Sequence, residues 1–208
     1  MITIVVANQK GGVGKTTTAL NLAASLSAAK RKILLIDIDS QANLTTGLGG
    51  EKKYQEVTIT DVLLGEATLE SLIESKDEFG FDFIAGSPDL ISAELEMAKI
   101  VNPTAVLKEK LRALSHLYDY CVVDSPPSLG MLSVSALRVA TKIVIPLQCE
   151  HFSIEGLSSM QRTMSEINKA TGSSLKIDGI LRTMFDKSNL RSKEISDKLE
   201  SAMERQLF

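Results

Sequence analysis

The amino-terminal part of the chain joins an apolar run, a glycine-rich loop and a helix-like pattern in immediate succession. Ile2–Ala7 is almost wholly apolar, and Asn8 to Thr17 separate it from a segment whose small and apolar residues recur at helical spacing. A buried strand that turns through glycines into a helix is typical of a phosphate-binding loop. The order of these segments therefore predicts an α/β fold whose first loop binds phosphate groups.

Each residue type in this loop has a separate electrostatic task. Glycines let backbone N–H groups turn toward phosphate oxygens, and the start of the helix adds a positive dipole. Lys15 is expected to neutralise the β- and γ-phosphate oxygens, and the Thr16 hydroxyl to bind Mg²⁺. ATP or GTP is therefore the expected ligand. The predicted nucleotide-binding residues of the loop are Lys10, Gly11, Gly12, Val13, Gly14, Lys15, Thr16 and Thr17.

The loop departs from the standard phosphate-binding pattern at one position, because Gln9 stands where that pattern has a glycine. It fits the variant Lys-Gly-Gly-x-Gly-Lys-Thr, whose additional lysine is Lys10. From this position Lys10 can face a phosphate from a second direction or from another subunit. The alternative interpretation is a surface lysine beside a tight turn.

Further apolar runs alternate with helix-like segments along the rest of the chain. Runs without polar alternation are typical of strands buried on both faces of a parallel sheet. The predicted strands are Ile2–Ala7, Ile33–Asp37, Phe81–Ala85, Tyr120–Asp124, Ile143–Gln148 and Leu175–Leu181. The predicted helices are Thr16–Ala29, Ile59–Gly65, Leu69–Ser75, Pro103–Leu117, Ser153–Ala170 and Ser192–Arg205. Their alternation predicts an α/β fold with a doubly wound, mostly parallel β-sheet flanked by helices.

Length and composition narrow the class of protein. The 208 residues suit one domain over residues 1–208, and a net charge of -3 argues against binding polyanions through bulk charge. Cys121 and Cys149 lie in apolar segments without Cys-x-x-Cys spacing, which predicts buried thiols rather than a zinc site. Met1 leads directly into the first strand, and no apolar run approaches the roughly 18 residues of a spanning helix. We therefore expect a cytoplasmic protein.

Two predicted strands end in aspartate, and the carboxyl ends of parallel strands share one edge of the sheet. Asp124 follows an apolar strand, as does the Walker-B carboxylate that holds Mg²⁺ through water. Asp39 is the candidate for orienting the attacking water, and Asp37 for supporting the metal's outer shell or Lys15. The alternatives are a strand-end cap for Asp124 and a helix cap or turn for the other two. The catalytic candidates are Lys10, Lys15, Asp39 and Asp124.

Two loops near this edge are candidates for conformational switches. Ser125–Gly130 is a stiff, proline-containing turn that follows Asp124 directly, and we expect it beside the γ-phosphate position. Gly47–Val57 is rich in Gly, Lys and Glu, and we expect it to hold a nucleotide-responsive segment.

The motifs together resemble the ParA/MinD group of deviant Walker-A ATPases, and within it the ParA/Soj branch of partitioning ATPases. The group's first motif is similar to Ala7–Thr18, with Lys10 as the signature lysine. Its two switch motifs are similar to Asp37-x-Asp39-x-Gln41-x-Asn43 and Asp124-x-Pro126-Pro127-Ser128-Leu129-Gly130. A further family stretch resembles Pro146-x-Gln148-x-Glu150-x-Phe152-x-x-Glu155-Gly156-Leu157.

The resemblance implies an ATP-dependent molecular switch that hydrolyses ATP to ADP and phosphate slowly and with Mg²⁺. It implies that ATP binding forms a homodimer in which each Lys10 reaches the partner's phosphates. It also implies non-specific DNA binding and a ParB-like partner that stimulates hydrolysis during plasmid or chromosome partitioning. We accordingly expect nucleoid association and no stable membrane association.

The chain also departs from the group. Relatives continue past the helix that matches Ser192–Arg205 into another strand, a loop and a closing helix, whereas this sequence ends at Phe208. In relatives that part carries base contacts and some of the DNA-binding surface. We therefore expect a domain that lacks the family's last strand and helix and has an open sheet edge.

Two alternative functions are open at this point. A MinD-like, membrane-associated division-site ATPase shares the loop, but its first switch reads Asp-x-Asp-x-Gly-Leu-Arg-Asn, so Gln41 and Asn43 favour the ParA branch. An electron-donating ATPase similar to the nitrogenase iron protein would need paired cysteines at a dimer axis. Neither Cys121 nor Cys149 has such a neighbour in the sequence.

Overall fold

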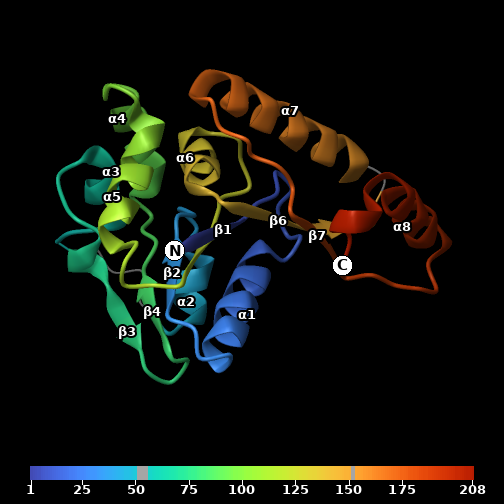
Figure 1. Ribbon diagram of the computed structural model, residues 1–208, viewed down its shortest axis with the longest axis horizontal. Coiled ribbons are helices and arrows are strands. Elements are labelled where there is room, and N and C mark those ends of the chain that lie inside the picture. The colour runs from blue at the N-terminus through green and yellow to red at the C-terminus, as the bar shows by residue number, and fades with distance from the viewer. Residues whose placement is uncertain (51–55, 151–152) are drawn as a thin grey trace.

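The computed structural model describes residues 1–50, 56–150 and 153–208. Within these ranges, seven strands form one sheet in the order β3-β4-β2-β5-β1-β6-β7 (Figure 1). The strands are β1 (Ile2–Val6), β2 (Ile33–Asp37), β3 (Glu74–Lys76), β4 (Phe81–Ile84), β5 (Tyr120–Asp124), β6 (Lys142–Gln148) and β7 (Gly179–Thr183). All neighbouring pairs are parallel except β3 with β4. The predicted doubly wound, mostly parallel sheet is confirmed.

Helices cover both faces of this sheet. They are α1 (Lys15–Ala28), α2 (Asn43–Gly47), α3 (Ile59–Leu64), α4 (Leu90–Met97), α5 (Val106–Leu114), α6 (Met131–Val139), α7 (Ser153–Thr171) and α8 (Leu190–Met203). Short 3-10 turns lie at Glu70–Leu72, Pro103–Ala105 and Glu204–Gln206. Figure 1 shows α1 and α2 on one side of the sheet, α3 to α7 on the other, and α8 beyond β7. In the described ranges, none of the helices combines the length and apolarity needed to cross a bilayer.

The central strands have unbroken apolar sequences because each of them packs against a hydrophobic core on both faces of the sheet. Leu34 and Ile36 of β2 belong to the core beneath α3 to α7, whereas Ile33 and Leu35 pack in the core beneath α1. Residues that alternate along one strand therefore serve two different cores. Both cysteines are buried thiols, as predicted, and burial raises the pKa of each.

The predicted helix Leu69–Ser75 is wrong. Only Glu70–Leu72 forms a 3-10 turn, and Glu74–Lys76 pairs antiparallel with β4 as the edge strand β3. A short helix over these residues would leave most of its backbone N–H and C=O groups without partners. Pairing with the edge of β4 satisfies such groups, so the tertiary environment outweighs the local helix propensity.

The boundaries of the last strand also differ from the prediction. β7 begins at Gly179 rather than Leu175, because the Asn168 side chain of α7 occupies the hydrogen-bonding groups of the Leu175 backbone. Asn168 Nδ2 donates to the Leu175 carbonyl, and the Leu175 N–H donates to Asn168 Oδ1. The helices α2, α4 and α6 were not predicted. α6 buries six of its nine residues, so it lacks the polar stripe that marks an amphipathic helix in a sequence.

The outer edge of β7 is partly paired. Leu207 forms a parallel bridge with Ile180, and the Phe208 N–H donates to the Ile180 carbonyl at 2.8 Å. The Arg182 N–H in turn donates to the Phe208 carbonyl at 3.3 Å. The expectation of an open edge is therefore wrong at Ile180–Arg182.

Candidate nucleotide-binding site

The loop between β1 and α1 has the backbone geometry of an anion-binding turn. Gly12 and Gly14 have φ values of 74° and 86°, in the left-handed region that favours glycine. Gly14 directly precedes Lys15, the first residue of α1, and among the described residues no side chain caps that helix. The first N–H groups of α1 therefore remain available to an anion, as expected for a phosphate-binding loop.

Lys15 places a positive charge inside this loop. Its side chain is only 7% exposed, and its Nζ donates to the Lys10 carbonyl at 3.0 Å. Burial lowers the pKa of Lys15, whereas the carboxylates of Asp124 and Asp39 oppose that decrease. The three predicted charged residues are therefore close enough to interact.

Lys10 lies at the rim of the loop and points away from it. Its Nζ forms an ion pair with Glu150 and lies 3.4 Å from Gln148 Oε1, both at the carboxyl end of β6. Its backbone N–H donates to Asn8 Oδ1 at 3.0 Å, and Asn8 Nδ2 donates to the Pro146 carbonyl at 2.7 Å. Lys10 is thus anchored through its backbone to β6, with a side chain that extends outward.

The Asp124 carboxyl group is almost completely buried. The residue is 1% exposed, and among the described residues neither carboxylate oxygen has a partner. Burial raises the pKa of Asp124 to about 7, with Asp37 and Asp39 adding to the increase and Thr16 and Lys15 opposing it. A buried carboxylate of this kind is costly unless water or a metal satisfies it. The carboxylate and the neighbouring Thr16 hydroxyl are hard oxygen donors, so the residues present fit a hydrated Mg²⁺ ion.

Asp37 lies beside Asp124, but both of its carboxylate oxygens accept hydrogen bonds. Its Oδ1 accepts the Asp39 N–H at 3.0 Å, and its Oδ2 accepts the Thr45 N–H at 3.0 Å and the Thr45 hydroxyl at 2.9 Å. Burial nevertheless raises the pKa of Asp37 to about 6. Asp39 Oδ1 accepts the Gln41 N–H at 3.0 Å. Both aspartates therefore accept backbone N–H groups in turns, which is the alternative role predicted from the sequence. Through these hydrogen bonds the Asp37 carboxylate also fixes the segment that contains Asp39.

Three residues that support the site were not predicted. The Thr45 hydroxyl accepts the Gly86 N–H at 2.8 Å, and a Cβ on Gly86 would lie 2.8 Å from the carboxyl carbon of Asp37. The Thr183 hydroxyl of β7 donates to the Val13 carbonyl of the loop at 2.8 Å. In the sequence, these residues could have been identified only by their position, because Gly86 and Thr183 lie at or just after the carboxyl ends of strands.

The two predicted switch loops differ in how far the structure tests them. Ser125–Gly130 follows β5 directly, and its Ser125 hydroxyl donates to the Val6 carbonyl at the end of β1. This loop therefore lies at the same edge as the glycine loop. In the Gly47–Val57 segment, residues 51–55 lie outside the described residues, so that prediction remains untested.

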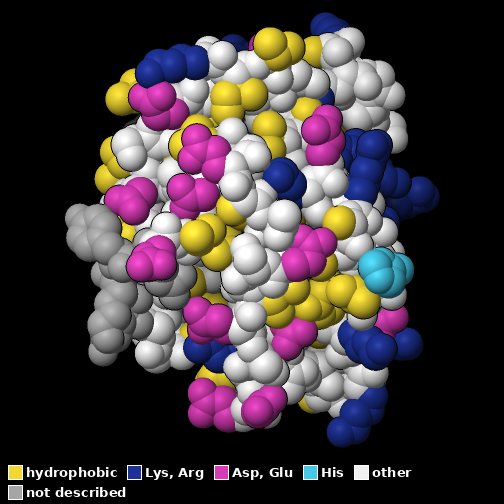
Figure 2. Space-filling view, turned by 90° about the vertical axis from the view of Figure 1, so that its left-hand side faces the viewer, with side chains coloured by type: hydrophobic (Ala, Val, Ile, Leu, Met, Phe, Trp, Pro, Cys, Tyr) yellow, Lys and Arg dark blue, Asp and Glu magenta, His cyan; other side chains and the backbone are white. Residues whose placement is uncertain are grey.

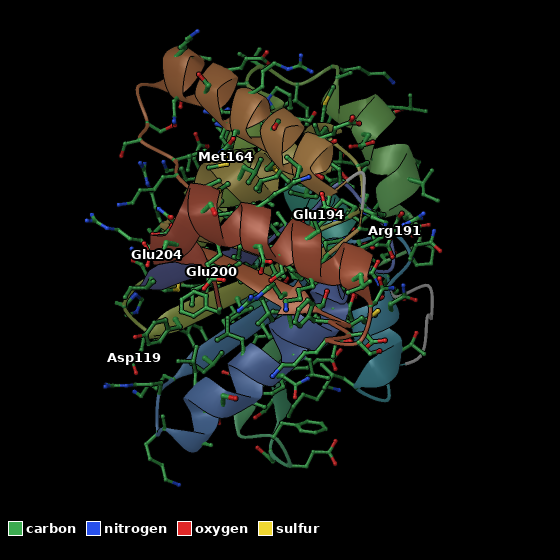
Figure 3. All side chains as sticks on the ribbon, turned by 90° about the vertical axis from the view of Figure 1, so that its right-hand side faces the viewer. Asp119, Met164, Arg191, Glu194, Glu200 and Glu204 are labelled. Carbon is green, nitrogen blue, oxygen red and sulfur yellow. The ribbon has the colours of Figure 1, made fainter. Side chains whose placement is uncertain are left out.

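A groove of about 700 Å³ adjoins the rim of the site. It is lined by residues at the end of β6 and on α8, namely Cys149, Glu150, Asn189, Arg191, Ser192, Glu194, Ile195 and Lys198. Figure 3 shows Arg191 and Glu194 toward the amino-terminal end of α8 and Glu204 toward the other end. The groove carries both signs of charge, and through Glu150 it contacts Lys10.

A doubly wound sheet with a glycine loop after β1, a buried lysine and an aspartate at the end of β5 defines a P-loop ATPase. Residues 1–177 match the family model described as an AAA domain. The chain is 40% identical over 205 residues to the chromosome partitioning protein ParA of Myxococcus xanthus, covering 99% of this chain and 72% of that protein. It is 41% identical over 183 residues to the sporulation initiation inhibitor protein Soj of Bacillus subtilis, covering 88% and 72%. The chain therefore belongs to the ParA/Soj family of partitioning ATPases.

A solved structure supports the same fold. It is a Mycobacterium smegmatis protein named cobyrinic acid a,c-diamide synthase, with a bound ATP analogue and magnesium. The two chains are 33% identical with a TM-score of 0.91, covering 99% of this chain and 84% of that one. Nucleotide and Mg²⁺ thus bind to this fold in a relative.

Proposed function

We propose that the chain binds ATP and Mg²⁺ in the loop between β1 and α1 and hydrolyses ATP to ADP and phosphate. The observation that carries this proposal is the buried Asp124 carboxylate, which among the described residues meets the geometry of no full hydrogen bond and has only the Thr16 hydroxyl and the Lys15 ammonium group close enough to lower its pKa. A magnesium triphosphate would place a cation near the carboxylate and anionic oxygens near the ammonium group. Thr16, and Asp124 through water, are the proposed metal ligands.

The chain's own residues would act mainly by positioning. The N–H groups of Gly11 to Thr17 and the Lys15 ammonium would hold the phosphates, while Asp39 would orient the attacking water. Asp37 would act through the backbone of Asp39, which it already holds. Mg²⁺, when bound, would offset the negative charge of the phosphates. Since no strong general base is present among these residues, slow basal turnover is expected.

We further propose that ATP binding forms a homodimer and that Lys10 serves the partner's phosphates. The outward direction of Lys10 supports this role, because its Nζ contacts Gln148 and Glu150 at the rim instead of its own loop. Membership of the family supports non-specific DNA binding on the nucleoid and a ParB-like partner that stimulates hydrolysis. The cellular role would be partitioning of a plasmid or chromosome, by one cytoplasmic ATPase domain over residues 1–208.

Titration calorimetry with Mg-ATP tests the site directly. We expect binding by the wild type and about 10- to 100-fold weaker binding by Lys15→Gln, because charge-assisted hydrogen bonds to phosphate are lost. Lys108→Gln is the matched control, since that exposed lysine lies near Met1 and Thr3, away from the glycine loop. Equal affinities for wild type and Lys15→Gln would contradict the proposed site.

Dimerisation has a separate test by light scattering with ATP. Lys10→Ala is expected to bind Mg-ATP as a monomer with nearly unchanged affinity but to dimerise less. A dimer profile equal to that of the wild type would contradict the role of Lys10 across the interface.

A further inference from the structure

Helix α6 begins directly after the Ser125–Gly130 loop, and a residue of another helix caps its amino terminus. The cap residue Gly130 has no side chain to accept the first N–H groups of the helix. Instead, the Leu132 N–H donates to Glu94 Oε1 of α4 at 3.0 Å, across 38 residues of sequence. A carboxylate at this position also interacts favourably with the helix dipole. Glu94 therefore provides in tertiary structure the cap that the local sequence lacks.

The same carboxylate lies directly against Gly130. Gly130 has φ of -73° and ψ of -173°, a conformation open to any residue, so backbone geometry does not require glycine. A Cβ at Gly130 would lie 2.9 Å from the carboxyl carbon of Glu94 and closer still to Oε1, so a side chain there would displace the end of the Glu94 side chain. Glu94 is thus packed against the last residue of the loop.

These contacts fix the loop at both ends. At its start, Asp124 lies in β5 and the Ser125 hydroxyl donates to the Val6 carbonyl at 2.9 Å. Near its end, the Ser133 hydroxyl of α6 donates to the Ser128 carbonyl, so the first turn of α6 and the loop are joined. An interaction that fixes the first turn of α6 therefore also fixes the Ser125–Gly130 loop next to Asp124.

We propose that Glu94 is a positioning residue for ATP hydrolysis, acting through the Leu132 N–H to hold the Ser125–Gly130 loop. This proposal rests on the proposed ATPase function. Glu94 lies on α4, which is at the surface on the side shown in Figure 2, where hydrophobic side chains are exposed among acidic ones. Ile91 and Leu95 of the same helix are 65% and 74% exposed. Glu94 itself is half-buried, so we expect a substitution there to alter the loop without opening a cavity in the core.

Steady-state kinetics should separate positioning from folding. Glu94→Ala is expected to lower kcat about tenfold, the equivalent of one lost cap, because the loop is less ordered in the transition state. The KM for ATP should change less than about twofold, because Lys15 and the glycine loop hold the phosphates independently. Glu94→Gln should restore most of the activity, since its amide oxygen can accept the same N–H. Glu96→Ala is the control, because the exposed Glu96 of α4 forms an ion pair with the exposed Lys99, which follows the helix.

A double substitution tests the contact itself. Gly130→Ala is expected to displace the Glu94 carboxylate and to lower kcat as Glu94→Ala does. The double variant should be no slower than either single variant, because both remove the same interaction. Hydrogen exchange of the Leu132 amide in the nucleotide-free protein should accelerate in Glu94→Ala and not in Glu96→Ala.

The outcomes distinguish this proposal from the one on which it rests. If the wild type hydrolyses ATP and Glu94→Ala has the same kcat, the positioning role alone is overturned. The same holds if the decreases in kcat of the two single variants multiply in the double variant. A folded wild type that neither binds nor hydrolyses ATP would overturn the ATPase function and the positioning role together. Faster Leu132 exchange in that case would show that the cap exists but serves no hydrolysis.

Discussion

Asp37 and Asp124 end neighbouring strands of the sheet and are direct partners in the β2–β5 register. Both are almost completely buried, and burial raises the pKa of both carboxyls. Yet Asp37 accepts three hydrogen bonds from Asp39 and Thr45, whereas Asp124 accepts none from the described residues. Two identical side chains at the same level of one sheet thus have opposite surroundings.

The difference favours a structural role for Asp37 and supports the proposed metal-binding role of Asp124. Hydrogen bonds to a charged acceptor stabilise by about 1.5–3 kcal/mol each, so Asp37 holds the Asp39–Thr45 segment against the end of β2. An unpaired buried carboxylate costs stability instead, and proteins retain such groups where a ligand will satisfy them. The surroundings of Asp124 are thus consistent with the proposed metal ligand, and those of Asp37 with a support for the neighbouring segment.

The largest expected effect comes from Asp124→Asn. We expect Mg-ATP turnover to fall about a thousandfold, because several kcal/mol of metal-based stabilisation depend on this carboxylate. The free energy of unfolding without Mg²⁺ should not decrease, since among the described residues only the Thr16 hydroxyl interacts with this carboxyl as a donor, and an asparagine oxygen can accept from it as well. Phosphate release and urea denaturation measure the two quantities, with the exposed Asp197→Asn on α8 as control. A clear loss of stability in Asp124→Asn would show that Asp124 also stabilises the fold, and would contradict the difference between the two carboxylates.

The pH dependence of stability should show the second effect. A native Asp124 keeps its proton up to about pH 7, whereas an unfolded aspartate loses it near pH 3.8, so the native state binds more protons between these values. The free energy of unfolding should therefore decrease from pH 4 to 7 by roughly 2–4 kcal/mol from this group.

Denaturation without Mg²⁺ at several pH values, compared between wild type and Asp124→Asn, isolates that contribution from other titrating groups. The groups that interact with the carboxyl are Thr16, Asp37, Asp39 and Lys15. We expect Asp124→Asn to become more stable relative to the wild type as pH rises. Parallel curves for the two proteins would contradict a raised pKa of Asp124.

Asp37→Asn should give the smallest effect, and on stability rather than on metal binding. An asparagine in this place offers one oxygen acceptor and turns an amide N–H toward a backbone donor, so we expect a loss of about 2 kcal/mol. Urea denaturation measures the loss, and Thr45→Ser, which keeps the hydroxyl, serves as control. Unchanged stability together with weaker Mg²⁺ binding would assign Asp37 to the metal's outer shell.

Much of this molecule is predictable from contiguous residues. The strands and the glycine loop follow from patterns of neighbours along the chain, because burial on both faces needs unbroken apolar runs and a left-handed backbone favours glycine. The positions of Lys15 and Asp124 at one edge follow from parallel topology. The family resemblance rested on the same local motifs.

Other features depend on residues that meet only in space. β3 forms because β4 presents an open edge, and α6 is capped by Glu94 from a distant helix. The sequence placed Asp37 and Asp124 at equivalent strand ends and could not tell them apart. Only the folded chain brings Thr45 and Gly86 to the Asp37 carboxylate and leaves the Asp124 oxygens without a full hydrogen bond from the described residues. Whether a buried polar group is satisfied depends on its surroundings and not on its residue type.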